Sequence, residues 1–203
     1  MDTLKYIVDK YNIDLSRPSP FWITFNRIKD LPVLFSELNF KSGAEIGTLE
    51  GVFSEILCRE LPKTKIYSVD PWKYYPIRRN FRKSWMYEPM YQRVKAKLSA
   101  YPNSKIIRKT SMKAVTAFPD ESLDFVFIDA DHRFEYVTND IAEWSKKVKK
   151  GGIISGHDFE IVDRQTDYVH IRHVVYAWTK AHSIHPWFIL DDPFERGWMW
   201  VKT

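Results

Sequence analysis

The chain has 203 residues, a net charge of +5 and 44% hydrophobic residues, which predicts one domain with a packed core and excludes global disorder. No apolar run approaches the roughly 20 residues that cross a membrane, and the first residues lack a signal-peptide pattern. Cys58 is the single cysteine, which excludes an internal disulfide. We therefore expect a cytoplasmic protein that has no membrane partner.

Residues 1–40 are predicted to form an N-terminal helical extension. Leu4, Ile7, Val8 and Tyr11 recur at helical spacing. A second amphipathic stretch, 21–40, follows a loop that contains two prolines. The sequence leaves three roles open for this extension: it could shield an edge of the sheet, cover the active site, or contact a second copy of the chain in a homo-oligomer.

Residues 41–203 are predicted to form one α/β domain, because strands and helices alternate along them. Such alternation favours a mostly parallel sheet with helices on both faces. The expected strands are 43–47, 65–70, 104–108, 123–129, 152–156, 187–190 and 197–202, and the expected helices are 51–61, 87–99, 112–118, 134–149 and 169–182. Residues 72–86 are long for a connection between a strand and a helix, so they are expected to form an insertion.

The strongest motif lies at the first of these strands, where Glu45 and Gly47 are followed by Gly51. Glycines at a strand-to-helix turn let a ligand approach the backbone, and the helix N-terminus attracts a negatively charged group. The next strand ends at Asp70, and an acid there is the usual partner of ribose hydroxyls. These residues predict a nucleoside-binding β-α-β unit, with a tight turn that binds nothing as the alternative. The Gly-x-Gly-x-x-Gly pattern of dinucleotide folds is missing, which argues against a nicotinamide-dependent oxidoreductase.

Two later strands bring further acids and histidines to the same edge. The apolar strand 123–129 ends in Asp129, and Asp131 and His132 follow it. The strand 152–156 is followed by His157 and Asp158. Open α/β sheets bind ligands at the carboxyl ends of their strands. Convergence of acids from four strands is hard to explain by packing alone, so these residues predict an active-site cleft.

The pattern Glu-x-Gly-x-x-x-Gly at 45–51 resembles motif I of the class I S-adenosylmethionine-dependent methyltransferases. The runs 127–132 and 150–159, together with Asp140 and Trp144 between them, resemble small-molecule O-methyltransferases that tailor cephalosporins and macrolides and, more distantly, catechol O-methyltransferases. The resemblance covers about residues 42–160. It implies a Rossmann-like, seven-stranded, mostly parallel sheet with one antiparallel edge strand, and S-adenosylmethionine as the methyl donor.

The resemblance also implies where the donor binds. Its methionine end would lie against the glycine turn, its ribose against the acid of the second strand, and its adenine between the segments that follow strands two and three. In this chain the implied donor-binding residues are Glu45, Gly47, Thr48, Gly51, Asp70, Trp72, Ser111, Met112 and Asp129. Ser111 is about as well explained as the N-cap of the next helix.

Methyl transfer needs little more than alignment, but a hydroxyl acceptor benefits from a base. His132 is the best candidate because imidazole titrates near neutral pH, and Asp131 would orient it or replace it. Asp129 would lie beside the reacting centre. A capping role for His132 remains open.

A divalent cation, Mg or Mn, is the second cofactor that the resemblance suggests. In catechol-type enzymes acids at the ends of strands four and five bind a cation, and Asp129, His157 and Asp158 fall at those positions. Histidine is a departure there because magnesium prefers oxygen ligands, whereas manganese, iron or zinc accept imidazole. The alternative is that His157 makes a hydrogen bond in the cleft and Asp158 caps the following helix.

The segment 72–87 interleaves aromatic residues with Arg78, Arg79, Arg82 and Lys83. We interpret it as a lid over a small-molecule acceptor rather than a nucleic-acid patch, because the excess positive charge is modest and no additional nucleic-acid-binding domain is present. A solvated loop without a role is the remaining alternative. The sequence as a whole predicts an S-adenosylmethionine-dependent O-methyltransferase of small molecules. The alternatives are a non-catalytic nucleoside-binding or scaffold protein of the same fold and a nucleic-acid methyltransferase.

Overall fold

The computed structural model of the chain describes residues 2–75, 83–159, 169–192 and 196–203. Within them the strands form one mixed sheet in the order β1-β7-β8-β6-β5-β2-β3-β4. The strands are β1 (Phe21–Thr24), β2 (Ser42–Ile46), β3 (Lys65–Val69), β4 (Ser104–Ile107), β5 (Leu123–Ile128), β6 (Val148–Gly156), β7 (Trp187–Asp191) and β8 (Gly197–Val201). No helix in these ranges combines the length and the apolar character that crossing a membrane requires.

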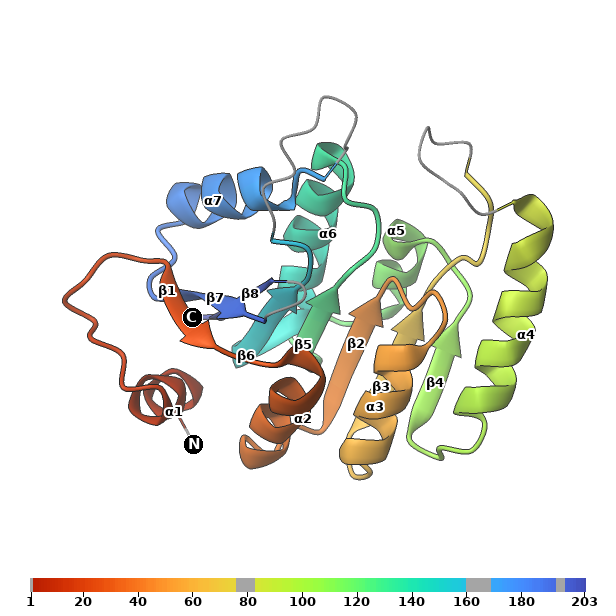
Figure 1. The fold of residues 1–203 in the computed structure, drawn as a ribbon, viewed down its shortest axis with the longest axis horizontal. Coiled ribbons are helices and arrows are strands. Elements are labelled where there is room, and N and C mark those ends of the chain that lie inside the picture. The colour runs from red at the N-terminus through yellow and green to blue at the C-terminus, as the bar shows by residue number, and fades with distance from the viewer. Residues whose placement is uncertain (1, 76–82, 160–168, 193–195) are drawn as a thin grey trace.

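Helices cover both faces of the sheet (Figure 1). On one face lie α1 (Thr3–Lys10), α2 (Arg27–Glu37), α3 (Val52–Glu60) and α4 (Tyr87–Leu98). On the other lie α5 (Ser111–Ala114), α6 (Phe134–Lys147) and α7 (Ile171–Ala181). Two short 3₁₀ turns, η1 (Ser84–Met86) and η2 (Val115–Ala117), adjoin α4 and α5. The expectation of a mostly parallel α/β sheet with helices on both faces is confirmed.

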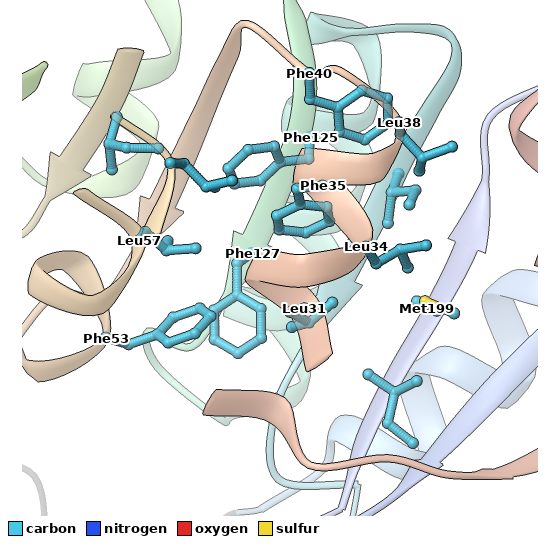
Figure 2. Close-up of a cluster of buried hydrophobic side chains, with 14 of the residues drawn as sticks. Leu31, Leu34, Phe35, Leu38, Phe40, Phe53, Leu57, Phe125, Phe127 and Met199 are labelled. Carbon is cyan, nitrogen blue, oxygen red and sulfur yellow. The ribbon is translucent and has the colours of Figure 1, made fainter. Parts of the chain in front are cut away.

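The core on the α2 face shows how the sequence pattern produces these layers. Leu31, Leu34 and Phe35 recur at helical spacing on α2 and are fully buried. The ring of Phe35 stacks on Phe125 of β5 with the centroids 3.9 Å apart, and Phe127 lies beside it (Figure 2). Because side chains alternate along a strand, Val126 faces the opposite core. Burial on both faces explains why β5 is an almost uninterrupted apolar run.

The sheet has eight described strands, one more than the resemblance implied. The additional strand is β1, which pairs in parallel with β7 along Phe21–Thr24. Burial alternates along β1, with Phe21 and Ile23 facing inward. Residues 21–24 of the extension predicted to be helical therefore form a strand. The alternation covers only four residues, and Asn26 then caps α2, so the short strand was not distinguished from the helical pattern after it.

Among the described strands β8 is the one that runs antiparallel to its neighbours, and it pairs with β6 on one side and β7 on the other. The expectation of an antiparallel strand is confirmed, but this strand does not form the edge itself, because β7 and β1 lie outside it. All other neighbouring strands are parallel. The strands β2, β3, β4, β5 and β6 therefore direct their carboxyl ends to one edge of the sheet.

Candidate functional site

A cavity of about 950 Å³ lies where β2, β3, β4 and β5 end. Figure 1 shows these strands directing their arrowheads to the same edge. Of the residues predicted for the site, those that line the cavity are Glu45, Gly47, Thr48, Asp70, Ser111, Met112, Asp129, Asp131 and His132. Gly51, Trp72, His157 and Asp158 are not part of that lining. The volume is at the upper end for a ligand pocket and leaves room for two small molecules.

The turn after β2 packs directly on the end of β5. Gly47 has a φ of 99°, and a Cβ atom placed on it would lie 2.0 Å from the carbonyl oxygen of Asp129. The Asp129 amide donates a hydrogen bond of 2.8 Å to the Ile46 carbonyl. Gly51 is the N-cap of α3 in the left-handed region and faces Val94 instead of the cavity. Thus Gly47 shapes the floor of the cavity, and Gly51 starts the helix.

Asp70 fixes the same turn from the end of β3. Its carboxylate accepts hydrogen bonds from the amides of Leu49, at 3.0 Å, and Trp72, at 2.6 Å. The Trp72 indole is buried, donates to the Leu49 carbonyl at 2.8 Å and packs on Tyr91. The predicted adenine wall at Trp72 therefore lies behind the turn, while Pro71, Lys73 and Tyr75 reach the cavity.

Glu45 is a carboxyl group buried in the floor of the cavity. It is 2% exposed and accepts a hydrogen bond from the Ser54 hydroxyl, which lies 2.6 Å from the Ser68 hydroxyl. Burial raises the pKa of Glu45 to about 8, although the Ser54 hydrogen bond opposes that shift. In the unliganded protein Glu45 is therefore mostly protonated at neutral pH.

We expect Glu45→Gln to remove a pH-dependent loss of stability. The folded-state pKa of about 8 lies above the ordinary value of 4.5, so the folded state holds the additional proton and stability falls as pH rises between those values. Gln keeps the neutral form, so the variant should gain on the order of 3 kcal/mol of unfolding free energy relative to wild type between pH 5 and pH 9. Urea unfolding at the two pH values measures this difference in unfolding free energy.

Glu143→Gln, a change of the same kind in a half-exposed residue, is the control. Parallel pH profiles for Glu45→Gln and wild type would contradict the expectation.

Thr48 is a buried polar group that the described residues leave without a hydrogen-bond partner. Its side chain lines the cavity and is 4% exposed, and no described residue forms a hydrogen bond with its hydroxyl. An unsatisfied buried hydroxyl costs about 1–3 kcal/mol. A polar ligand in this part of the cavity would recover that cost.

The segment after β4 forms a second polar cluster, at the α6 side of the cavity. The Ser111 hydroxyl donates to Asp140 Oδ1 and accepts from the Trp144 indole at 2.8 Å. Burial raises the pKa of Asp140 to about 7. Met112 lines the cavity next to this cluster. The N-cap of α5 is Thr110 rather than Ser111, so capping does not explain the serine.

Asp129, His132 and Asp158 meet where β5 and β6 end. The His132 Nε2 atom lies 3.2 Å from Asp158 Oδ2 and 3.5 Å from Asp129 Oδ1. Burial lowers the pKa of His132, but the hydrogen bond to Asp129 and the charge of Asp158 outweigh it, so the net shift is upward. The N-cap of α6 is Arg133, so His132 does not cap that helix.

Two of the predicted residues are positioned differently from their expected roles. Asp131 is held by Arg133 through contacts of 2.6 and 2.9 Å, which lower its pKa despite partial burial. That ion pair makes Asp131 a weak base. His157 is buried, and its Nδ1 atom lies 3.5 Å from Asp158 and 3.9 Å from Asp129. The cluster with three ligand atoms within 4.8 Å of one another contains His132 instead of His157.

Arg27 is a residue of the site that the sequence did not indicate. It starts α2, lines the cavity and lies 3.9 Å from Asp129 Oδ2, with its guanidinium over the rings of Phe53 and Phe127. Its side chain is 17% exposed. No motif surrounds it in the sequence. Its position depends on the packing of α2 on β5 through Phe35 and on the hydrogen bond of 3.0 Å from its amide to Asp192 Oδ2. Residues 76–82 of the predicted lid lie outside the described residues, whereas Lys73, Tyr75 and Tyr87 on either side line the cavity.

A family model described as a methyltransferase domain matches residues 44–159 of the chain. The uncharacterized protein y4gI of Sinorhizobium fredii is 25% identical over 158 residues. The match covers 75% of this chain and 16% of that protein, so the chain spans about a sixth of its relative.

Several solved structures resemble this fold over most of the chain. An O-methyltransferase of Bacillus cereus in complex with SAH has a TM-score of 0.64 at 15% identity, covering 98% of this chain and 90% of that one. A protein of Staphylococcus aureus provisionally named a caffeoyl-CoA O-methyltransferase has a TM-score of 0.65, with the same identity and coverage. Spermidine synthase of Thermotoga maritima has a TM-score of 0.55 at 13% identity, covering 81% of this chain and 54% of that one. At these identities the likeness shows the fold, and it does not by itself decide the reaction.

Proposed function

The chain belongs to the methyltransferase-domain family, and from that premise we propose that it transfers the methyl group of S-adenosylmethionine to a hydroxyl oxygen of a small molecule. The observation that carries the proposal is the cavity at the carboxyl ends of the strands, with Glu45, Thr48 and Asp70 at one part and Asp129 and His132 at another. The first part has the chemistry for a nucleoside donor, and the second has a base for an acceptor. The names of the B. cereus and S. aureus structures support oxygen as the acceptor atom.

The donor side is supported by two buried groups that a charged amino acid would satisfy. An ammonium group near Glu45 favours the ionised carboxylate and so offsets the burial that raises its pKa. The Thr48 hydroxyl offers a hydrogen bond to the same amino-acid end of the donor. Asp70 lies at the end of β3, where an acid contacts ribose hydroxyls in folds of this type.

The acceptor side needs a group that removes one proton. In the proposed reaction the acceptor oxygen forms a bond to the methyl carbon as the bond from carbon to sulfur breaks, which leaves S-adenosylhomocysteine. The acceptor's proton passes to the His132 imidazole, which Asp129 and Asp158 hold and whose charged form they stabilise. The remaining rate enhancement comes from alignment, because the sulfonium is already activated.

A divalent cation is the other occupant that this cluster fits. Two carboxylates and an imidazole offer ligand atoms within 4.8 Å of one another at Asp129, His132 and Asp158. Manganese, iron or zinc suit that mixed donor set better than magnesium does. A bound cation would orient the acceptor and lower the pKa of its hydroxyl. It competes with a proton on His132, because only neutral imidazole binds metal.

We expect the wild-type protein to bind S-adenosylhomocysteine with micromolar affinity and Asp70→Ala to bind it at least tenfold more weakly, about 1.4 kcal/mol. The variant loses the acceptor for the ribose hydroxyls and the hydrogen bonds to the amides of Leu49 and Trp72. Isothermal titration calorimetry measures both affinities.

Titration of added Mn²⁺, and of S-adenosylhomocysteine with and without chelator, tests the cation separately. Asp120→Ala, at an exposed acid paired with Lys147, is the control for losing a carboxylate. No binding by wild-type protein in either buffer would overturn the proposed function. Equal affinity of Asp70→Ala and wild type would remove Asp70 from the ribose site.

A further inference from the structure

Arg27 is a cation of the cavity that neither the donor binding nor the proton transfer proposed above uses. Its guanidinium lies over the rings of Phe53 and Phe127, with the centroids 5.3 and 5.7 Å away, and Nη1 lies 3.9 Å from Asp129 Oδ2. The rings support the flat guanidinium from one side. A guanidinium carries five N–H donors in a planar fork, so it can contact an acid of the protein and a ligand at the same time.

The residues beside Arg27 form an apolar wall of the cavity. Ile28 follows it on α2, and Val52, Phe53 and Ile56 come from α3, which lies next to α2 on the same face of the sheet (Figure 1). Ile28 is 42% exposed and Val52 is 53% exposed, although both are large apolar side chains. We call the part of the cavity lined by these five residues the α2–α3 pocket. A ligand with an apolar body would remove this surface from water, which is favourable.

The α2–α3 pocket adjoins the groups proposed for proton transfer. Asp129 connects the two, because its Oδ2 atom lies 3.9 Å from Arg27 Nη1 and its Oδ1 atom lies 3.5 Å from His132 Nε2. Arg27 and His132 therefore face different oxygens of one carboxylate, and a single small molecule can span the distance between them. A hydroxyl at His132 and a negatively charged group at Arg27 would then belong to the same ligand.

We propose that the methyl acceptor carries a carboxylate, which Arg27 binds, and that the α2–α3 pocket holds the acceptor's apolar body. The inference rests on the proposed function and names the class of acceptor, a small hydroxylated apolar acid. The planar fork of a guanidinium matches the two oxygens of a carboxylate and holds them with paired hydrogen bonds. Arg27 is then the residue that determines specificity for the acceptor.

A structural role for Arg27 accounts for only part of this arrangement. Arg27 is the first residue of α2, where the helix dipole disfavours a cation and favours an anion. The ion pair with Asp129 explains a positive charge at this position. It does not explain why the apolar side chains of Ile28 and Val52 lie exposed beside that charge. A negatively charged ligand with an apolar body accounts for both features.

The acids near the α2–α3 pocket do not exclude a negatively charged ligand. Asp129 and Asp158 both contact the His132 imidazole, at 3.5 and 3.2 Å. The methyl donor brings the positive charge of its sulfonium to the same reacting centre. Electrostatic attraction weakens with distance, so a carboxylate in direct contact with Arg27 gains more from that contact than it loses to acids farther away.

The test compares the three isomers of hydroxybenzoate with the matching hydroxybenzamides, which replace the carboxylate by a neutral group of similar size. Isothermal titration into protein saturated with S-adenosylhomocysteine measures each affinity. We expect wild-type protein to bind at least one hydroxybenzoate about tenfold or more tightly than its amide. Arg27→Gln should bring that ratio close to one. Arg59→Gln, at an exposed arginine of α3 outside the cavity lining, is the matched control and should keep the wild-type ratio.

The outcomes separate this inference from the proposed function. If no hydroxybenzoate binds the wild type more tightly than its amide, or if a folded Arg27→Gln keeps the wild-type ratio, the inference is overturned. Binding of S-adenosylhomocysteine then leaves the proposed function standing, whereas a wild type that does not bind it loses both. If Arg27→Gln does not fold, Arg27→Lys decides, because lysine keeps the charge and lacks the planar fork. The ratio should fall severalfold in Arg27→Lys, and an unchanged ratio would overturn the inference.

Discussion

His132→Asn is expected to lower kcat by about 10²- to 10⁴-fold while leaving the affinity for S-adenosylhomocysteine within about threefold of wild type. Asn can occupy the position between Asp129 and Asp158 and still form hydrogen bonds, but it cannot take a proton from a hydroxyl. The donor side of the cavity, at Glu45 and Asp70, is not changed by the substitution. The loss should therefore appear in turnover and not in donor binding.

The measurement is transfer of a radiolabelled methyl group to whichever acceptor a screen of phenols and sugar hydroxyls identifies, alongside titration with S-adenosylhomocysteine. His173→Asn is the matched control, because His173 is an exposed residue of α7 outside the cavity lining. A His132→Asn variant that turns over at the wild-type rate would exclude His132 as the base. Recovery of activity on raising the Mn²⁺ concentration would show that His132 acts as a metal ligand instead.

Gly47→Ala should abolish measurable donor binding and destabilise the fold by about 3 kcal/mol or more. Two effects combine at this position. The φ of 99° strains any residue with a side chain, and the added methyl group would lie 2.0 Å from the Asp129 carbonyl oxygen, which is a backbone atom and cannot rotate away. To relieve the clash, the turn after β2 must move away from the end of β5. These two segments form the floor of the cavity.

Gly151→Ala separates these effects. Gly151 also has a positive φ, 77°, but a Cβ atom there would meet only the Thr3 hydroxyl at 3.9 Å. It should cost about 1–2 kcal/mol from backbone strain and leave the affinity for S-adenosylhomocysteine unchanged. Chemical unfolding and titration calorimetry on both variants measure this. Equal stability and equal affinity of the two alanine variants would show that contact between the turn and β5 is unimportant.

The fold and the position of the site could be predicted because both depend on patterns that are local in sequence. The alternation of buried strands and amphipathic helices is visible in segments of five to fifteen residues, and the carboxyl ends of parallel strands meet by geometry. The placement of Glu45, Asp70, Asp129 and His132 around one cavity follows from that reasoning, and Ser111 was expected there from the resemblance.

The parts that were missed depend on contacts between distant segments or on side-chain direction. The position of Arg27 depends on the packing of α2 on β5 and on the hydrogen bond from its amide to Asp192, and no local pattern encodes either contact. Which of His132 and His157 lies closer to the carboxylates of Asp129 and Asp158 depends on where the backbone turns after β6. His157 stays close to the line of β6 and packs near Phe127, whereas Asp158, with a φ of 54°, leaves it and meets His132. The direction of the Trp72 side chain, which the sequence placed at the adenine, also depends on a backbone turn: the residue has a φ of 41° and its indole donates to the Leu49 carbonyl behind the β2 turn.

The pairing of β1 with β7 has a consequence for the order of folding. During synthesis Phe21–Thr24 emerges early but has no strand to join until Trp187–Asp191 has been made. Contacts between segments so far apart in sequence close large loops and form slowly. The donor side of the cavity, built from β2, β3 and β5, can form from the middle of the chain. The start of α2 is fixed later, because the Arg27 amide donates to Asp192 Oδ2, at 3.0 Å, only once β7 has been made. Assembly of the acceptor end should therefore be a late step in folding, and a chain stalled before β7 would hold a partial donor site with one side open.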